Sequence, residues 1–426
     1  MAEIKPFRAW RYNNKIGSSI ADVVSPLFDV VTADRLGELY MNPLNSIHLS
    51  VPDGGPSKAG KTLEDWKNNG TLVMDELPGI YIYYQFYKCP FNGSEKCRKG
   101  FACNIRVHEW SEKVILHHEN TIPGSVTDRL EILAETGFHA SPTHGLYSDP
   151  QNLLEHWMDE AITEPVYTNE SDGIREIIGV IHDHSVIQEF VRLISEKQII
   201  LADGHHRFEA SIQHARMRRA SGDLTPEFHL MYLSNISSGD LTILPTHRMV
   251  DISAALSEPE LLEKLSEDFE LTPVSSVTEG EKIIAAKPEA FIMVSANNSI
   301  RLDLKKGLAI KNPWPFPENI LRLDLTILHY FILEKIFGIP GAEQRKSGKI
   351  KFERSPETIL KAVREGKAAA GFITRPVSIN SVFEVCESGF TLPQKSTWFY
   401  PKLNSGYFFS SVLPGESRLP DFVRFQ

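Results

Sequence analysis

The sequence predicts a mixed α+β fold, because strand-like and helix-like patterns are interspersed along the whole chain. Residues 78–87 and 98–107 are rich in β-branched and aromatic side chains, which is typical of paired strands. In residues 127–136, apolar side chains recur at intervals of three and four, as on one face of a helix. An apolar run that stops at Asp203-Gly204 and is followed at once by a helical pattern indicates a strand, a tight turn and the start of a helix.

The composition excludes several classes of protein. Of the 426 residues, 42% are hydrophobic and 23% are charged, as in ordinary soluble globular proteins. The formal net charge of −10, without a long basic run, argues against a surface for nucleic acid and against a polybasic membrane anchor. No apolar stretch is long enough to span a bilayer, and the first residues lack the apolar core of a signal peptide, so we expect a cytoplasmic protein. The length accommodates two to three domains and leaves the oligomeric state open.

An N-terminal α+β region is expected over residues 1–112. Residues 53–61 have the composition of a flexible surface loop, although residues 55–62 also match the P-loop pattern. A working P-loop follows a buried strand and opens a helix. Residues 46–51 make a fair strand and a helix can begin at Thr62, but a stretch rich in proline and glycine separates the two. The preferred interpretation is a mobile loop before a short helix.

The cysteines are expected to be reduced thiols. Cys89, Cys97, Cys103 and Cys386 include no Cys-x-x-Cys pair, and a cytoplasmic chain of this size does not depend on disulfides. A zinc site formed by the first three cysteines and His108 is a conceivable alternative. Their uneven spacing argues against it, because structural zinc sites have short and regular ligand spacings.

One candidate for chemistry lies near the start of the predicted core region, residues 113–250. His117, His118 and Glu119 stand where a strand-like run ends, and a helix is expected from Thr127. A carboxylate at a strand end beside imidazoles suits a general base. The alternative is a charged, solvated loop without a chemical role.

The second candidate is the stretch that begins at Asp203. Gly204 allows a sharp turn and a close approach of the backbone to a ligand, and the start of a helix favours an anion. His205 and His206 follow, and Arg207 can clamp phosphate oxygens with a planar pair of donors. Together they predict a phosphate-binding turn. The alternative is an ordinary helix start capped by Asp203.

The next part of the chain predicts a small insertion followed by a core helix. His247 and Arg248 end an apolar run, where they form a further candidate for binding a substrate or a phosphate, although such an arginine can also simply pair with a carboxylate. Residues 251–312 resemble a small α+β insertion. A proline-rich stretch at 313–317 indicates a linker, and residues 320–337 are the most strongly apolar helical pattern of the chain.

The C-terminal region, residues 313–426, carries a last group of polar side chains beside aromatic residues. Lys395, Ser396, Thr397 and Lys402 supply two cations and two hydroxyl groups there. A loop of this composition can hold a phosphorylated ligand, and it is equally typical of a decorated surface.

Three of these stretches resemble a known family. Asp203-Gly-His-His-Arg-Phe-Glu-Ala210 resembles the nucleotide-phosphate turn of the ParB/sulfiredoxin-like superfamily, and especially the Asp-Gly-His-His-Arg motif of archaeal ADP-dependent free serine kinases. The chain as a whole resembles a large, mostly uncharacterised bacterial family related to those kinases. The longer resemblance runs through Ser25-Pro26, His118-Glu119, Asp128-Arg129, Pro245–Arg248 and Lys395–Thr397.

The resemblance implies a ParB/sulfiredoxin-like nucleotide-binding core with an N-terminal extension, the small insertion and a C-terminal region that completes the site. It implies that Glu119, beside His118, takes the proton from the acceptor hydroxyl as the phosphoryl group arrives. It also implies that residues 203–207 bind the phosphates of ADP or ATP. Mg²⁺ is expected with the nucleotide, and Asp203 is one possible ligand. Gln394-Lys-Ser-Thr397 is similar to a Pro-Lys-Thr-Thr loop that lines the site of those kinases, except that Pro393 lies one place earlier.

The resulting expectation is a small-molecule kinase that transfers a phosphoryl group from a nucleotide to free L-serine or a similar hydroxylated metabolite. The alternative is a nucleotide-binding regulatory protein of the same superfamily that has no turnover. A ParB-like role on DNA is disfavoured, because the chain is acidic and contains no convincing helix-turn-helix pattern.

Overall fold

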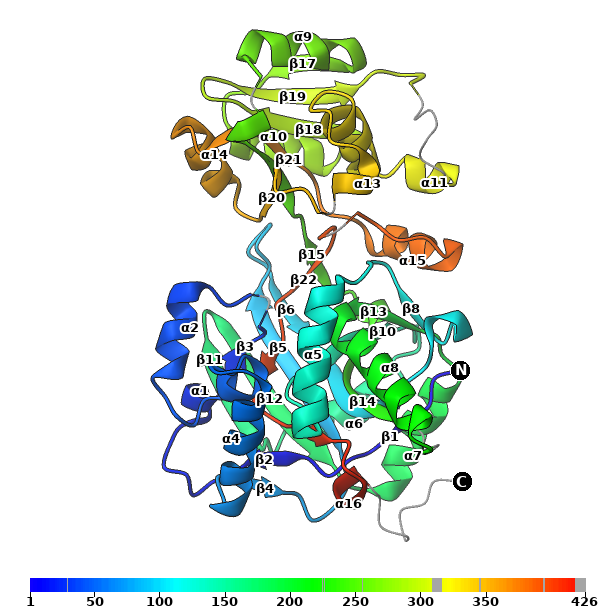
Figure 1. Ribbon diagram of the computed structural model, residues 1–426. Coiled ribbons are helices and arrows are strands. Elements are labelled where there is room, and N and C mark those ends of the chain that lie inside the picture. The colour runs from blue at the N-terminus through cyan, green and yellow to red at the C-terminus, as the bar shows by residue number, and fades with distance from the viewer. Residues whose placement is uncertain are drawn as a thin grey trace. The chain divides into compact units, whose positions relative to one another are not determined.

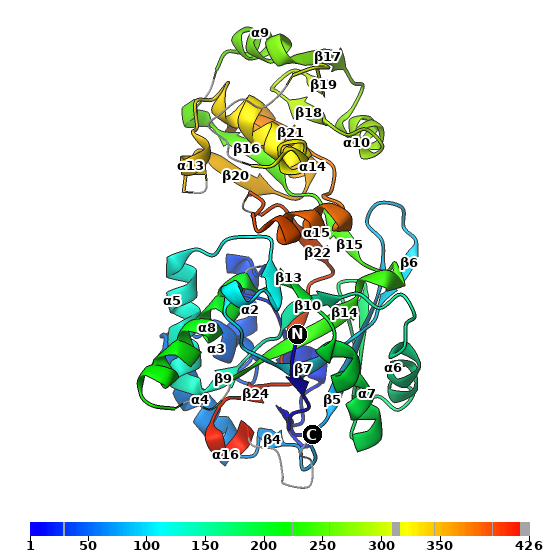
Figure 2. The same ribbon diagram turned by 90° about the vertical axis from the view of Figure 1, so that its right-hand side faces the viewer.

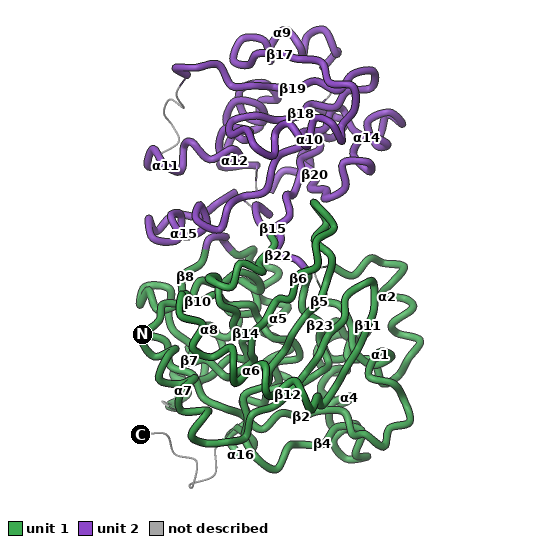
Figure 3. Tube along the Cα trace, turned by 180° about the vertical axis from the view of Figure 1, so that it is seen from behind, with its two compact units in different colours: residues 1–117, 121–242, 401–426 green, residues 118–120, 243–400 purple. Residues whose placement is uncertain are grey.

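The protein has a mixed α+β architecture, as the sequence predicts, and its chain divides into two compact units (Figure 3). Unit 1 comprises Met1–His117, Thr121–Thr242 and Pro401–Gln426, and unit 2 comprises His118–Asn120 and Ile243–Tyr400. The computed structural model describes residues 1–28, 30–223, 225, 227–254, 256–308, 316–344, 346–393 and 395–417. Within these ranges, no helix has the length and apolar character that a membrane span requires.

Unit 1 is built on a ten-stranded, mainly antiparallel sheet (Figure 1). Parallel pairing occurs between β10 and β14 and between β13 and β8. The strand order is β11 (Tyr167–Ser171), β12 (Ile174–Ile181), β5 (Ile80–Lys88), β7 (Gly100–Arg106), β14 (Phe228–Asn235), β10 (Thr143–Tyr147), β13 (Ile199–Asp203) and β8 (Ile115–His117), with β1 (Ile4–Lys5) on β7 and β6 (Glu95–Arg98) on β5.

The central strands of this sheet are buried on both faces. Successive side chains of a strand point to opposite faces, so Ile80, Ile82 and Tyr84 enter one apolar cluster while Tyr81 and Tyr83 enter another. The predicted pairing of strands over residues 78–87 and 98–107 is confirmed, since β5 pairs with β6 and with β7, although β6 begins earlier than predicted, at Glu95.

The helices of unit 1 pack against this sheet at different places. Figures 1 and 2 show α5 (Pro123–Thr136) and α8 (His205–Ala220) side by side near the β8, β13 and β10 end of the sheet. α6 (Glu155–Ala161) packs on β12, and α7 (His184–Ser195) packs on β1.

Unit 2 contains a six-stranded antiparallel sheet that separates two apolar clusters. Its order is β17 (Phe269–Pro273), β19 (Ser299–Leu304), β18 (Ala290–Val294), β21 (Ala368–Ile373), β16 (His247–Asp251) and β20 (Ile350–Glu353). α10 (Val277–Ala285) and α14 (Pro356–Arg364) share one cluster with Ile292, whereas α9 (Glu258–Asp268) shares the other with Phe291.

Short elements complete the two units. They are β2 (Trp10–Tyr12), α1 (Ile20–Val23), β3 (Ser25–Pro26), α2 (Ala33–Tyr40), α3 (Ile47–Ser50), α4 (Pro56–Asn68), β4 (Leu72–Met74), β9 (Phe138–His139), β15 (Thr242–Leu244), α13 (Gly341–Gln344), α15 (Ile379–Ser388), β22 (Trp398–Tyr400), β23 (Asn404–Ser405), β24 (Ser410–Ser411) and α16 (Pro414–Ser417).

The P-loop pattern of residues 55–62 is not a phosphate-binding loop. Pro56 opens α4, so the pattern lies within the first turns of a helix, and the expected mobile loop over residues 53–61 is wrong for most of its length. Residues 47–50 form a short helix and not the expected strand. Proline is favourable in the first helical turn, where its missing N–H costs nothing, and this outweighs the turn-like composition.

The predicted core helix over residues 320–337 is core, but it is not one helix. It consists of α11 (Glu318–Leu321), α12 (Asp324–Ile327) and a π-helical segment, η4 (Leu328–Glu334). Leu323 is extended between the first two, with ψ 135°. Asp324 accepts hydrogen bonds from Glu289 N–H at 2.8 Å and from Arg375, so tertiary contacts hold the break.

The sequence predicts four regions, 1–112, 113–250, 251–312 and 313–426. They remain predictions, because the division into two compact units does not test them. Parts of the predicted linker at 313–317, and Gln394 of the C-terminal loop, lie outside the described residues.

Candidate functional site

The turn after β13 has the strand, turn and helix that the sequence predicts. Gly204 has φ 89° and ψ 28°, and α8 begins at His205. A Cβ atom at Gly204 would lie 2.6 Å from Thr143 Cγ2 and 3.0 Å from Arg207 Nη2, so the turn requires glycine. Gly204, and not Asp203, is the N-cap residue, so no side chain caps the first turn of α8. A helix start of this kind favours an anion.

Asp203 is held between two cations. Its Oδ1 accepts a hydrogen bond from Lys402 Nζ at 3.0 Å, and its Oδ2 accepts one from Arg207 Nη2 at 3.2 Å. Burial opposes its ionisation, but Lys402, Arg207 and His205 together hold the pKa of Asp203 well below its usual range. The carboxylate is therefore ionised at neutral pH.

Arg207 is buried and bound mainly to the protein itself. Its Nη1 donates to Ser141 Oγ at 3.1 Å and to Pro142 O at 2.6 Å, while its Nη2 donates to Asp203. Its Nε has no hydrogen-bond partner in the described part of the chain. The guanidinium thus fixes the turn and contributes positive charge. To bind a phosphate with two parallel hydrogen bonds, it would have to give up its hydrogen bonds to these acceptors.

The two histidines of the turn differ in their surroundings. His206 Nε2 accepts a hydrogen bond from the N–H of Ile122 at 2.9 Å, directly before α5. His206 therefore fixes the start of a neighbouring helix. His205 is buried, with an exposed fraction of 6%, and its interaction with Asp203 lowers the pKa of that carboxyl.

Lys402 joins this group from the C-terminal part of unit 1. Its carbonyl oxygen accepts a hydrogen bond from Gln85 Nε2 at 2.9 Å, and Gln85 also donates to the buried carboxylate of Glu176. Glu176 further accepts hydrogen bonds from Tyr83 and Asn404. The sequence drew attention to Lys402, but it gave no sign that this residue meets Asp203, because the two lie 199 positions apart.

In unit 2, the residues around Glu119 are paired with the Lys395 loop. Glu119 Oε1 accepts a hydrogen bond from the backbone N–H of Lys395 at 3.1 Å. His118 Nε2 lies 2.8 Å from Thr397 Oγ1, and His118 O accepts from Leu392 N–H at 2.7 Å. Two stretches that the sequence singled out separately, His118-Glu119 and Lys395–Thr397, are therefore neighbours.

The Lys395 loop is itself constrained. Lys395 has φ 53°, in the left-handed region, which is uncommon for a residue with a side chain. Ser396 is buried, and its Oγ donates to the carbonyl of Pro393. Its hydroxyl group thus fixes the loop from within.

His247 and Arg248 lie inside unit 2 at the start of β16. His247 Nδ1 accepts from Thr374 N–H at 3.2 Å, and burial lowers the pKa of His247 to about 3. Arg248 Nε donates to His329 Nε2 at 3.1 Å, and its Nη1 donates to the carbonyl of Thr246. Burial lowers the pKa of Arg248 to about 9, although Glu119 has the opposite effect. Arg248 still carries its charge at neutral pH.

The described residues contain no ready-made group of metal ligands. No three or more His, Cys, Asp or Glu side chains among them are grouped for an ion. The imagined zinc site is therefore wrong, since Cys89, Cys97, Cys103 and His108 do not converge. Asp203 does not fit the role of Mg²⁺ ligand in this arrangement, because both of its oxygens already face cations.

The comparison with family models identifies the chain at the level of its family. Residues 4–326 match the model described as a protein of unknown function, DUF1015. The chain belongs to this DUF1015 family. No curated protein matches it.

Solved structures resemble this DUF1015 protein only distantly. A free serine kinase in complex with AMP is 14% identical, with 75% of this chain and 93% of that chain covered and a TM-score of 0.38. A conserved hypothetical protein from Pyrococcus furiosus is 12% identical, with coverage of 75% and 97% and a TM-score of 0.36. SbnI with a C-terminal truncation, from Staphylococcus aureus, is 13% identical, with coverage of 71% and 84% and a TM-score of 0.35.

Proposed function

We propose that this DUF1015 protein is a small-molecule kinase with free L-serine or a similar hydroxylated metabolite as acceptor. The observation that carries the proposal is the turn at Gly204, where a glycine-capped helix start lies beside two cations that share one carboxylate. The proposal includes a ParB/sulfiredoxin-like relationship of the core, which rests on the motif of residues 203–207.

The proposal assigns the donor phosphates to the turn in unit 1. The N–H groups of the first turn of α8 are suited to phosphate oxygens. Lys402 adds positive charge, and Arg207 holds the turn in place. Phosphoryl transfer depends mainly on such positioning and charge neutralisation.

The proposal assigns the acceptor hydroxyl to Glu119, on the resemblance of His118-Glu119. In the reaction, the acceptor oxygen forms a bond to the terminal phosphorus while the bond from that phosphorus to the nucleotide oxygen breaks. The hydroxyl proton passes to the Glu119 carboxylate, and the nucleotide leaves with the electron pair of the broken bond and one phosphate fewer. Lys395, whose backbone already binds Glu119, supplies positive charge on the acceptor side.

Turnover tests the proposal directly. The full chain is incubated with Mg²⁺, L-serine and either ADP or ATP, and phosphoserine is measured by mass spectrometry. Glu119→Gln should lower the rate at least about a hundredfold, because the amide cannot accept the proton. Nucleotide affinity, measured by calorimetry, should change less than about threefold, since the phosphates are assigned to other residues.

The matched control is Glu384→Gln on α15, an exposed glutamate of the same unit, which should leave the rate unchanged. If neither nucleotide supports transfer to serine or to any member of a panel of hydroxylated metabolites, the kinase proposal fails. Tight nucleotide binding in that case would favour the regulatory alternative.

A further inference from the structure

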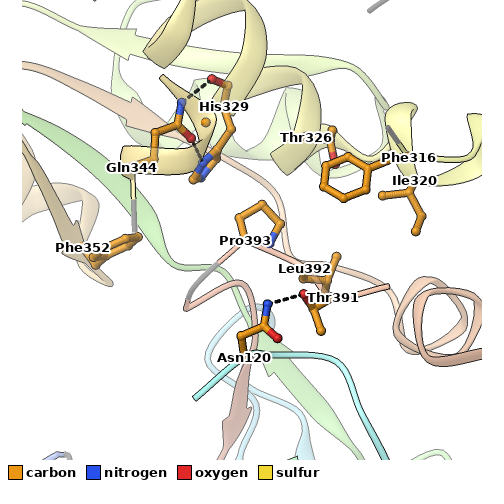
Figure 4. A pocket seen from close by; sticks show the side chains of 11 residues that line it. Asn120, Phe316, Ile320, Thr326, His329, Gln344, Phe352, Thr391, Leu392 and Pro393 are labelled. Carbon is orange, nitrogen blue, oxygen red and sulfur yellow. Dashed lines mark hydrogen bonds between the residues drawn. The ribbon is translucent and has the colours of Figure 1, made fainter. Parts of the chain in front are cut away.

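Unit 2 contains a cavity of about 180 Å³ (Figure 4). Neither the family match nor the resemblance gives this cavity a function. Much of its wall is apolar and comes from Phe316, Ile320, Phe352, Leu392 and Pro393. A cavity of about 150 Å³ is known to hold benzene, so this one has room for a molecule of roughly six to eight non-hydrogen atoms.

Two polar residues of the wall have their hydrogen bonds satisfied by the chain. His329 Nε2 accepts from Arg248, so the ring proton is on Nδ1, which donates to Gln344 Oε1 at 2.7 Å. Gln344 Nε2 donates to the carbonyls of His329 and Ile339 at 2.9 and 2.8 Å. Figure 4 shows this pair at one side of the cavity. These groups therefore shape the wall and offer little to a ligand.

Thr326 is the contrasting case. The residue has an exposed fraction of 1%, and its buried hydroxyl has no hydrogen-bond partner among the described residues. A buried hydroxyl without a partner costs free energy. Since Thr326 lines the cavity, a ligand oxygen there would satisfy it.

The opposite side of the cavity continues into the Glu119 segment. Asn120 Nδ2 donates to Thr391 Oγ1 at 2.6 Å, and both residues line the cavity (Figure 4). Glu119 precedes Asn120 in the chain and binds the backbone of Lys395. One residue of the cavity wall is therefore the direct chain neighbour of Glu119, the residue that the proposed reaction uses as base.

Two cations lie near one lining residue of the cavity. The ring centroid of Phe352 is 5.2 Å from Arg248 Cζ and 5.6 Å from Lys395 Nζ. None of the described lining residues carries a carboxylate. An ammonium group entering this cavity would lose its hydration without gaining an ionic partner, which is costly.

We propose that this cavity binds the acceptor, and that the acceptor is a short-chain hydroxy carboxylate without an α-ammonium group. This assignment rests on the proposed kinase function and narrows its acceptor class. The apolar wall receives the hydrocarbon part, Thr326 donates to a ligand oxygen, and the two cations beside Phe352 favour the carboxylate.

Binding without turnover tests the assignment. Calorimetry on the full chain compares L-serine, β-hydroxypropionate, which is serine without its ammonium group, and β-hydroxybutyrate, which adds a methyl group. Each probe is titrated with and without AMP. We expect β-hydroxypropionate to bind at least about tenfold more tightly than L-serine, and β-hydroxybutyrate at least as tightly as β-hydroxypropionate.

Two substitutions locate the binding. Thr326→Val should weaken β-hydroxybutyrate binding about tenfold, and Thr326→Ser should restore most of it, because serine keeps the hydroxyl. A purely structural role of Thr326 would change unfolding and leave the affinity unaltered, so thermal unfolding is measured on both variants.

The outcomes separate the two proposals. If L-serine binds as tightly as the hydroxy acids, or if Thr326→Val leaves the affinity unchanged, the cavity assignment is overturned whether or not phosphoserine forms. If the hydroxy acids bind in a Thr326-dependent manner but are never phosphorylated, the cavity assignment stands as a binding site and the kinase function fails.

Discussion

Asp203 shows how one side chain can set the charge of the candidate phosphate turn. It shares its two oxygens between Lys402 and Arg207, all three side chains being largely buried. Asp203→Asn would leave two buried cations with one neutral amide between them. We expect the variant to bind inorganic phosphate at least about fivefold more tightly, because an anion then takes the place of the carboxylate. We also expect it to lose about 3 kcal/mol of stability.

Calorimetry with phosphate in metal-free buffer, together with urea unfolding, measures both effects. The control is Asp223→Asn, which removes a carboxylate that pairs with Arg218 at the other end of α8 and should leave phosphate affinity unchanged. Weaker phosphate binding by Asp203→Asn would contradict this account of the turn.

The kinds of residue at the candidate site were predictable from the sequence, but most of their contacts were not. Local motifs found the glycine turn and Glu119, since a turn and a strand end are encoded by neighbouring residues. Arg207 was expected to face a ligand, yet it donates to Ser141 and Pro142. Lys402 reaches Asp203 only through the fold. Contacts between distant segments have no local signal.

At the scale of an element, the start of α8 depends on the size of one residue. Gly204→Ala adds a Cβ 2.6 Å from Thr143 Cγ2 at a φ of 89°. We expect a loss of about 2–4 kcal/mol, combining backbone strain with the clash. The double variant with Thr143→Ala should recover the part due to the clash. Urea unfolding of the single and double variants measures both contributions.

Gly222→Ala is the matched control beyond the other end of α8. Gly222 has φ 91°, and an added Cβ would meet nothing within 4 Å, so this variant reports strain alone. We expect it to cost about 1 kcal/mol. An equal loss in both variants would show that the packing against Thr143 is unimportant.

Element prediction failed where a local pattern competed with tertiary contacts. Residues 320–337 have a continuous apolar pattern, but Asp324 is drawn into bonds with Glu289 and Arg375 and the helix breaks. At residues 56–62, Gly60 and Lys61 of the P-loop pattern lie in a helix that Pro56 opens. The strand pairs of the first sheet were predictable because their composition and their turn signals agree.

At the scale of the whole molecule, the chain passes more than once from one compact unit to the other. Unit 1 takes its residues from three separate stretches, and residues 118–120 belong with unit 2. The chain passes from one unit to the other directly after β8, near β15 and directly after β22, and none of these crossings lies at the predicted linker of residues 313–317. Sequence reasoning, which looks for linkers, could not place them.

Both units contain buried histidines that resist protonation, which makes acid sensitivity a property of the whole chain. Burial lowers the pKa of His139 in unit 1 to about 4 and that of His329 in unit 2 to about 3, from 6.5 in an unfolded chain. As pH falls below about 6.5, the unfolded state binds protons that the folded state refuses. Each such histidine should therefore cost about 1.4 kcal/mol per pH unit until its folded pKa is reached.

Urea unfolding followed by tryptophan fluorescence at several pH values between about 7 and 5 measures this slope, in a range above the titration of most carboxylates. His329→Gln should reduce the slope for unit 2 by about one proton, since glutamine does not titrate. His156→Gln on α6, an exposed histidine, should leave the slope unchanged. A stability that stays constant from about pH 6.5 to 5 would mean that the buried imidazoles accept protons in the folded state, and the packing around His139 and His329 would then have to open in acid.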